Sequence, residues 1–390
     1  MVSLISGTIP AAGKVPPHQP IRALLRAGKN QEAIAELCAI LVTRPDDLDA
    51  KELLFDAFSY SRNWPPALAL AEELVRRAPQ EPKFQRDLIT TLSNMKRYDE
   101  ALSRALPFIE KYPDDLTMLD VVKVACFFTG RTDEAIRYGQ RALDIRDAEA
   151  CRNPPPMAVT APTGRKGRRV ISFSLWGPAP FYAYGAMINA VLSRTIYPGW
   201  ECLFYVDGAV PKACVEFLIA SGAKVRRIED EYPGVGLFQR FLVMNDPTVE
   251  LFLVRDCDAR LSVEEAALVD EWLGSGYPFH AVRDHVLHNE LMIGCLWGGR
   301  ADCGIDIVEL MRRYFVHGPT AKYGHDQRML GLMLWPLIRS RVLVHDKYYR
   351  LPGVHTLPLP DPKSHFGAGR QNLDGVLREV DRLGIPRVLS

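Results

Sequence analysis

The segment ELFLVRDCDARLS, Glu250 to Ser262, decides the fold class of the second half of the chain. Its apolar run predicts a buried strand, which ends at two aspartates one residue apart, Asp256 and Asp258. In an extended segment, residues i and i+2 point the same way, so both carboxylates can reach one ligand while Cys257 faces elsewhere. Carboxylate oxygens suit Mg²⁺ or Mn²⁺, so we expect a divalent cation there.

The same residues have a structural alternative. One aspartate can cap the helix expected from Val263, while the other pairs with Arg255 or Arg260. Ser262 is the better capping residue, because Glu265 follows it three positions later as in a capping box. Capping therefore leaves the aspartates unexplained and favours the cation.

The sequence around this segment alternates between strands and helices. The expected strands are VISFSLW (170–176), CLFYVD (202–207), KVRRI (224–228) and ELFLVRD (250–256). The expected helices lie near 181–194, 211–221 and 236–245. This alternation predicts a mostly parallel α/β sheet whose ligand crevice lies beyond the carboxyl ends of the strands, where the two aspartates stand.

The first part of the chain is an internal repeat of 34 residues. The repeated positions are Ala33, Ala67, Ala101 and Ala135, together with Pro45, Pro79 and Pro113. The period, the small residue and the closing proline resemble the tetratricopeptide repeat, a pair of helices that stacks into a superhelix. Residues 1–150 are therefore expected to form a tetratricopeptide-repeat domain.

A proline-rich and then basic stretch follows the repeats. Its sequence is AEACRNPPPMAVTAPTGRKGRR, residues 148–169. Such a composition is typical of a linker, and we expect its basic end to be solvated. The domain organisation predicted is repeats over 1–150, a linker over 151–169 and an α/β domain over 170–390.

The composition excludes several classes of function. Forty-eight basic residues against 47 acidic ones leave a formal charge of +1, which gives no global attraction to nucleic acid or to an anionic membrane. The proline-containing start argues against a signal peptide, and the longest apolar stretch, Met329–Ile338, is too short to cross a bilayer. Eight cysteines without a CxxC pair suggest neither a zinc ribbon nor a disulfide framework. We expect a cytoplasmic protein.

From Val170 to about Gly369 the chain resembles the GT-A-type glycosyltransferases, a nucleotide-diphospho-sugar transferase fold. The resemblance rests on VISFSLWG, ECLFYVDG, RDCDAR, LMIGCLWGGR, YGHDQRML and SHFGAG. It implies that Asp256 and Asp258 hold Mn²⁺ or Mg²⁺ against the diphosphate of a nucleotide-sugar. A late histidine completes the metal shell in such enzymes, which implies His365, with His345 as its rival.

The resemblance also implies donor-binding residues. The expected nucleotide-pocket wall comprises Phe173, Ser174 and Trp176, and the further donor contacts comprise Arg240, Asp256, Trp297, Gly298, Gly299 and Gln327. Two of these residues, and the neighbouring Asp326, have structural alternatives. Trp297 can be a core residue instead of a stacking partner for a pyranose. Arg240 can form a surface salt bridge, and Asp326, beside Gln327, can cap a helix.

Candidates for the catalytic base are Asp326, Asp284 and Glu290. The neighbouring His285 and His288 can chelate zinc if they lie on one helix face. After the strand-like PFHAV we expect them to point in different directions, so a zinc site is not expected.

The sequence thus predicts a metal-dependent glycosyltransferase that moves a sugar from a nucleotide-sugar to a hydroxyl acceptor. The repeats are expected to bind a protein or glycan acceptor or another partner. The alternative is a repeat scaffold with a catalytically inactive transferase-like domain. Nucleotidyl transfer is disfavoured, because the LWGPAPFYAYG segment after the first strand lacks lysine and arginine.

Overall fold

The computed structural model describes residues 18–228, 236–317, 324–359, 365–366 and 372–388. The start of the chain, used above to argue against a signal peptide, and the glycines after His365 lie outside these residues. Contacts divide the chain into two units, Met1–Arg131 and Thr132–Ser390. Across the described residues, no helix combines the length and apolar character needed to cross a membrane.

The described part of the first unit is helical. It contains α1 (Gln19–Arg26), α2 (Asn30–Thr43), α3 (Leu48–Tyr60), α4 (Trp64–Arg77), α5 (Pro82–Asn94), α6 (Tyr98–Lys111) and α7 (Leu116–Phe128). The residues before α3, α5 and α7 are Asp47, Glu81 and Asp115, each 34 residues from the next, and each side chain accepts a backbone N–H bond. These bonds satisfy donors that a helix start leaves open. The 34-residue period therefore corresponds to helix pairs, as predicted.

The repeated alanines are buried inside these pairs. Ala33, Ala67 and Ala101 occupy equivalent positions in α2, α4 and α6, and each is fully buried. A small side chain at this position lets neighbouring helices approach closely, since helix spacing depends on the residues at the contact.

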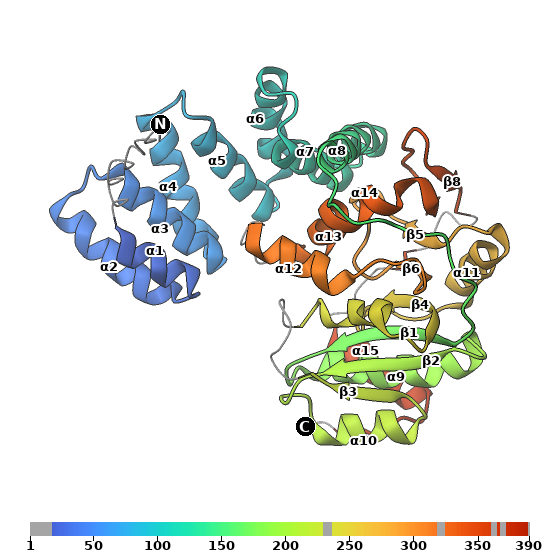
Figure 1. Ribbon diagram of the computed structural model, residues 1–390. Helices are drawn as coiled ribbons and strands as arrows, with labels where there is room; N and C mark the ends of the chain where they lie inside the picture. The colour runs from blue at the N-terminus through green and yellow to red at the C-terminus, as the bar shows by residue number, and fades with distance from the viewer. Residues whose placement is uncertain (1–17, 229–235, 318–323, 360–364, 367–371, 389–390) are drawn as a thin grey trace, which may run out of the picture. The chain divides into compact units, whose positions relative to one another are not determined.

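The second unit is built on an eight-stranded sheet (Figure 1). Its strands are β1 (Arg168–Leu175), β2 (Glu201–Val206), β3 (Lys224–Arg227), β4 (Val249–Arg255), β5 (Phe279–Arg283), β6 (Trp297–Arg300), β7 (Val342–Asp346) and β8 (His355–Leu357). The spatial order is β3-β2-β1-β4-β6-β5-β7-β8. All neighbouring pairs are parallel except the two that include β6. The carboxyl ends of β4 and β5 therefore lie at the same edge of the sheet.

Helices cover both faces of this sheet. One core cluster joins the sheet to α9 (Pro180–Ile196), α10 (Lys212–Ala220), α11 (Val263–Ser275) and α15 (Leu373–Arg382). The other joins it to α8 (Thr132–Arg152), η1 (Gln239–Asn245), α12 (Ile307–His317), α13 (His325–Met329), η2 (Leu330–Leu334) and α14 (Trp335–Ile338). A short turn of helix, η3 (Arg339–Arg341), leads into β7. The predicted strands are thus present, and the sheet is mostly parallel, as expected. The helices expected near 181–194 and 211–221 are α9 and α10, and the one expected near 236–245 is the 3-10 helix η1.

The boundary expected at residue 150 differs from the division found in the structure, because α8 packs within the second unit. Asp147 of α8 accepts hydrogen bonds from Trp335 Nε1 at 2.7 Å and from Arg339 Nη2 at 2.8 Å. Gly139 lies directly against the ring of Tyr349. Gly139, in the fourth repeat, stands at the position that Leu37, Ala71 and Ala105 occupy in the first three repeats.

The stretch expected to be a linker is held against the sheet. Thr160 N donates to Cys303 O at 2.9 Å, while Thr163 Oγ1 and Arg165 N donate to the Asp302 carboxylate at 2.9 and 3.1 Å. Arg165 also donates through Nη2 to Val249 O at 2.7 Å, so part of the basic end is bound rather than solvated. These bonds satisfy backbone groups that a free linker leaves to water.

The contact between α8 and Tyr349 leads to a prediction. A Cβ added at Gly139 meets Tyr349 Oη at 2.3 Å, and that hydroxyl is anchored on Val286 O. Helix propensity alone favours Gly139→Ala by about 1 kcal/mol, but overpacking a buried contact costs about 1–3 kcal/mol. We expect a net loss of stability on urea unfolding. Gly274→Ala in α11, where an added Cβ meets nothing within 4 Å, is the control and should stabilise; equal effects would contradict the contact.

The Asp147 interactions make stability pH-dependent. Burial opposes ionisation, but the bonds from Arg339 and Trp335 outweigh it and lower the pKa of Asp147. Its stabilisation is therefore fully present above the unfolded pKa of about 3.9 and is lost as pH falls through the folded pKa. We expect Asp147→Asn to lower the free energy of unfolding by roughly 1.5–3 kcal/mol at pH 7 and by much less at pH 3. Asp144→Asn, exposed on the same helix, should show no such trend.

Candidate functional site

The two aspartates lie in a bend that follows β4, at the carboxyl edge of the sheet, and both are half-buried. Helix α9 holds this bend through Asn189, which donates to Ala259 O at 2.8 Å and accepts from Leu261 N at 3.2 Å. The thiol of Cys257 points away and donates to Ser174 O at 3.3 Å. The backbone that presents the aspartates is thus fixed by neighbouring elements.

Neither flanking arginine forms an ion pair with these carboxylates. Arg255 is buried and paired with Glu265 of α11, while Arg260 donates to Glu379 Oε2 at 2.9 Å. Ser262 is the N-cap of α11 and accepts from Glu265 N at 3.1 Å, as predicted. The expected alternative, in which one aspartate caps α11 and the other pairs with Arg255 or Arg260, is therefore wrong.

The partner of Asp256 is Arg240, which lies in η1 and is only 1% exposed. Its guanidinium pairs with Asp256 and also with Asp326 Oδ2 at 2.7 Å. Gly294 leaves the space for this group, because a Cβ there meets Asp326 Oδ2 at 2.2 Å. Arg240 is thus neither a surface salt bridge nor a group free to contact a nucleotide, and Asp326 is an ion-pair partner instead of a helix cap.

Two residues of the expected nucleotide wall are structural. Phe173 is fully buried and stacks on Phe204. Ser174 is buried too, and its hydroxyl accepts from Arg240 N at 2.8 Å, which holds η1 beside β1. Trp176 alone of the three is partly exposed, at the carboxyl end of β1, where it lies over Gly236.

The expected sugar-pocket residues form part of the core. Trp297 is fully buried between Phe241 and Phe252, so its faces cannot stack on a pyranose. A Cβ at Gly298 meets Phe252 O at 2.4 Å, and one at Gly299 meets the ring of Phe279 at 2.5 Å. The two glycines therefore serve the close packing of β6 against its neighbours.

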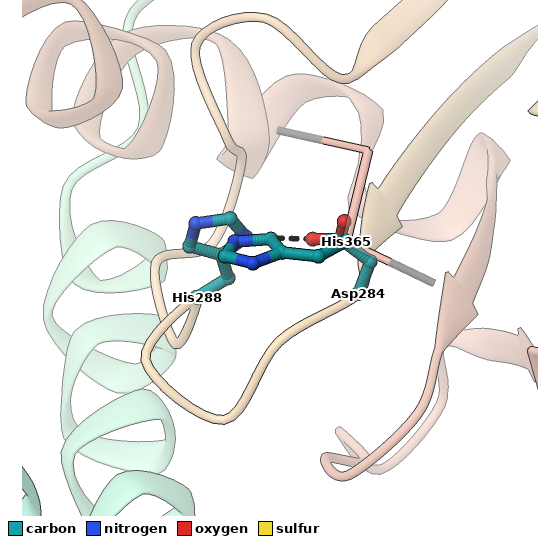
Figure 2. A group of neighbouring side chains, drawn as sticks. All are labelled: Asp284, His288 and His365. Carbon is teal, nitrogen blue, oxygen red and sulfur yellow. Dashed lines mark hydrogen bonds and ion pairs between the residues drawn. The ribbon is translucent and has the colours of Figure 1, made fainter. Parts of the chain in front are cut away.

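The late histidine lies in a different group from the one expected. His365 lies with Asp284 and His288, and one ligand atom from each lies within 4.8 Å of the others (Figure 2). Its rival His345 is buried in β7, where it bonds His280 at 2.7 Å and Glu271 at 3.0 Å. In the described part of the chain, neither histidine forms a hydrogen bond or ion pair with Asp256 or Asp258.

The remaining candidates for the base are also engaged. Asp284 is buried and accepts from Phe366 N, and its other oxygen bonds His288 Nδ1 at 2.6 Å. Glu290 pairs with Arg146 at 3.1 Å. Gln327 is partly buried on α13. Each of the three proposed carboxylates thus already has an ion-pair or hydrogen-bond partner.

The electrostatics of the bend favour an added cation. Burial raises the pKa of Asp258, and nearby Arg240 and Arg260 only partly oppose this effect. A carboxylate whose charge is disfavoured by burial gains more than an exposed one from a bound cation. The carboxylate oxygens of Asp258 are therefore suitable ligands for Mg²⁺ or Mn²⁺, whereas Asp256 is already ion-paired with Arg240.

Sequence reasoning missed two features of the site. One is the buried Arg240–Asp326 pair, which joins residues 86 positions apart and leaves no local pattern.

The other is the grouping of Asp284 with His288. A β-turn closed by His288 N and His285 O at 2.8 Å brings these side chains together without a helix. The four-residue spacing of Asp284 and His288 was the available signal. Burial and the nearby imidazoles lower the pKa of His285 to about 4.

Comparisons with known proteins give distant likenesses. No family model matches the chain, and no curated protein matches it. A mutant O-GlcNAc transferase of Thermobaculum terrenum is similar over 60% of this chain and 44% of its own, with 18% identity and a TM-score of 0.40. MamA of Desulfovibrio magneticus RS-1 covers 32% of this chain and 71% of its own, with 17% identity and a TM-score of 0.31. At TM-scores below 0.5 these likenesses establish neither fold nor function.

The pairing of Arg240 predicts a large stability effect. Removing one partner of a buried ion pair leaves uncompensated charge and costs about 3–5 kcal/mol. We expect Arg240→Gln to lower the free energy of unfolding by that amount at neutral pH, measured by urea titration. Arg328→Gln, exposed on α13, is the matched control and should change it by less than about 0.5 kcal/mol. A small effect of Arg240→Gln on the free energy of unfolding would show that the ion pairs with Asp256 and Asp326 do not stabilise the fold.

Proposed function

We propose that the second unit is a metal-dependent glycosyltransferase that moves a sugar from a nucleotide-sugar to a hydroxyl acceptor. The observation that carries the proposal is the position of Asp256 and Asp258, at the carboxyl end of β4. This strand belongs to the parallel run β3-β2-β1-β4. Parallel α/β sheets bind their ligands outside the carboxyl ends of such strands.

The chain's own residues would prepare this site. Asn189 and Ser174 fix the bend, so Asp258 meets an incoming cation with little rearrangement. Arg240 pairs with the Asp256 carboxylate and so keeps this side chain in position when no ligand is bound. Trp176, partly exposed at the end of β1, offers an aromatic face for a nucleotide base. A bound Mg²⁺ or Mn²⁺ would neutralise the departing diphosphate.

The repeats would bind a protein or glycan acceptor, or another partner. A hollow of about 430 Å³ on the first unit offers both polar groups and aliphatic surface, and it is lined by Thr90, Ser93, Asn94, Lys96, Tyr98, Thr117, Asp120, Val121 and Val124. These residues lie on α5 and α7, at the start of α6 and, for Lys96, in the turn between α5 and α6. Stacked helix pairs commonly present extended binding surfaces of this kind.

The test is ligand-induced stabilisation. With Mn²⁺ and UDP, GDP or dTDP at about 100 times the dissociation constant, the wild type should gain about 2.7 kcal/mol for the correct nucleotide. Asp258→Asn should lose this gain. Because burial raises the pKa of Asp258, its charge destabilises the fold at neutral pH, so the unliganded variant should melt at or above the wild-type temperature.

The control is Asp270→Asn, an exposed aspartate on α11, which should keep the full ligand-induced shift. Hydrolysis of the matching nucleotide-sugar by wild type, and its loss in Asp258→Asn, would separate an enzyme from an inactive transferase-like scaffold. A full shift in Asp258→Asn, or a much lower melting temperature without ligand, would make the aspartates structural and overturn the proposal.

A further inference from the structure

A second group of metal-binding side chains lies after β5. Asp284 directly follows the strand, His288 follows it by a β-turn, and His365 arrives from near the carboxyl terminus of the chain. One ligand atom from each of the three lies within 4.8 Å of the others (Figure 2). Tetrahedral ligands about 2.0–2.1 Å from a zinc ion are roughly 3.3 Å apart, so small side-chain rotations would close the group on an ion.

The carboxylate of this group is already oriented. Its side chain is fully buried, and one oxygen accepts a backbone N–H from Phe366 while the other bonds His288 Nδ1 at 2.6 Å. Binding of one ion by both side chains would replace the hydrogen bond between His288 and Asp284. The bond from Phe366 also places the neighbouring His365 at the group.

Three imidazole rings lie close together at this group. His285 stacks on His365 with ring centroids 4.2 Å apart, and His288 lies 5.1 Å from His365. His285 Nδ1 accepts from Leu287 N at 3.2 Å, so this ring forms a wall of the group.

We propose that Asp284, His288 and His365 form a binding site for a divalent transition metal, with Zn²⁺ as the best-fitting ion. Two imidazole nitrogens and one carboxylate oxygen are a donor set that zinc accepts, and they leave a fourth position open. His365 is exposed, so that position can be reached from solvent. The inference goes beyond the proposed transfer reaction and does not rest on it.

This site is distinct from the aspartate bend. β4 and β5 lie on either side of β6, and neighbouring strands are about 4.8 Å apart, so the two strand ends are separated by about 10 Å. The bend offers carboxylate oxygen, which suits hard cations, whereas the group after β5 offers two nitrogens. Zinc alone, without nucleotide, should therefore occupy the second site.

The experiment uses the full chain without a histidine tag, stripped with chelator and dialysed. Zn²⁺ is titrated calorimetrically, and Co²⁺ binding is followed by its visible absorption. We expect one equivalent of Zn²⁺ in the wild type. His365→Ala should weaken affinity at least about tenfold without lowering the melting temperature, because this side chain is exposed. His288→Ala should weaken it in the same way.

Two controls make the result decisive. His355→Ala removes an exposed imidazole from β8, paired with Leu343 near the amino end of β7, and should bind zinc as the wild type does. The double variant Asp256→Asn, Asp258→Asn should also keep zinc while losing any nucleotide-dependent shift with Mn²⁺. The proposal is overturned if His288→Ala and His365→Ala bind zinc like the wild type, or if only the double aspartate variant loses it.

Discussion

The geometry of the candidate site depends on one buried charge. Arg240 is 1% exposed and lies between Asp256 and Asp326, with its guanidinium ion-paired with both. A guanidinium without partners at this depth would destabilise the fold by several kcal/mol, so the surrounding chain has to bring carboxylates to it. The pairing fixes η1, the bend after β4 and the start of α13 relative to one another. The open space at Gly294 belongs to the same constraint, since any side chain there would displace the Asp326 carboxylate.

The strands on either side of β6 end in the same way. β4 ends in Arg255 followed by Asp256, and β5 ends in Arg283 followed by Asp284. In both cases the arginine turns inward to a buried carboxylate of another element, while the aspartate stands at the edge of the sheet. Alternation along a strand produces this division, because successive side chains point to opposite sides. The edge thereby gains acidic groups whose backbone is held by ion pairs in the core.

The ends of the two strands offer different kinds of ligand atom. The bend after β4 presents Asp258, whose charge is disfavoured by burial and which a hard cation would stabilise. The turn after β5 brings His288 to the buried carboxylate of Asp284, and His365 adds a second imidazole, so this group would suit a softer, nitrogen-preferring ion. The two proposed cation sites would lie about 10 Å apart on one edge of the sheet.

The sequence by itself determined the features that are local or periodic. The 34-residue spacing of Ala33, Ala67 and Ala101 gave the helix pairs, and the apolar runs gave β1 to β4, because both patterns repeat within a few residues of their cause. The capping role of Ser262 was likewise readable from its neighbours. Only the tertiary structure decided what each functional candidate touches. Trp297 is a core residue because β6 runs antiparallel between β4 and β5. Arg240 meets Asp326, and His365 meets Asp284, across 86 and 81 positions of chain, and contacts at that separation follow from the order of strands rather than from any local pattern.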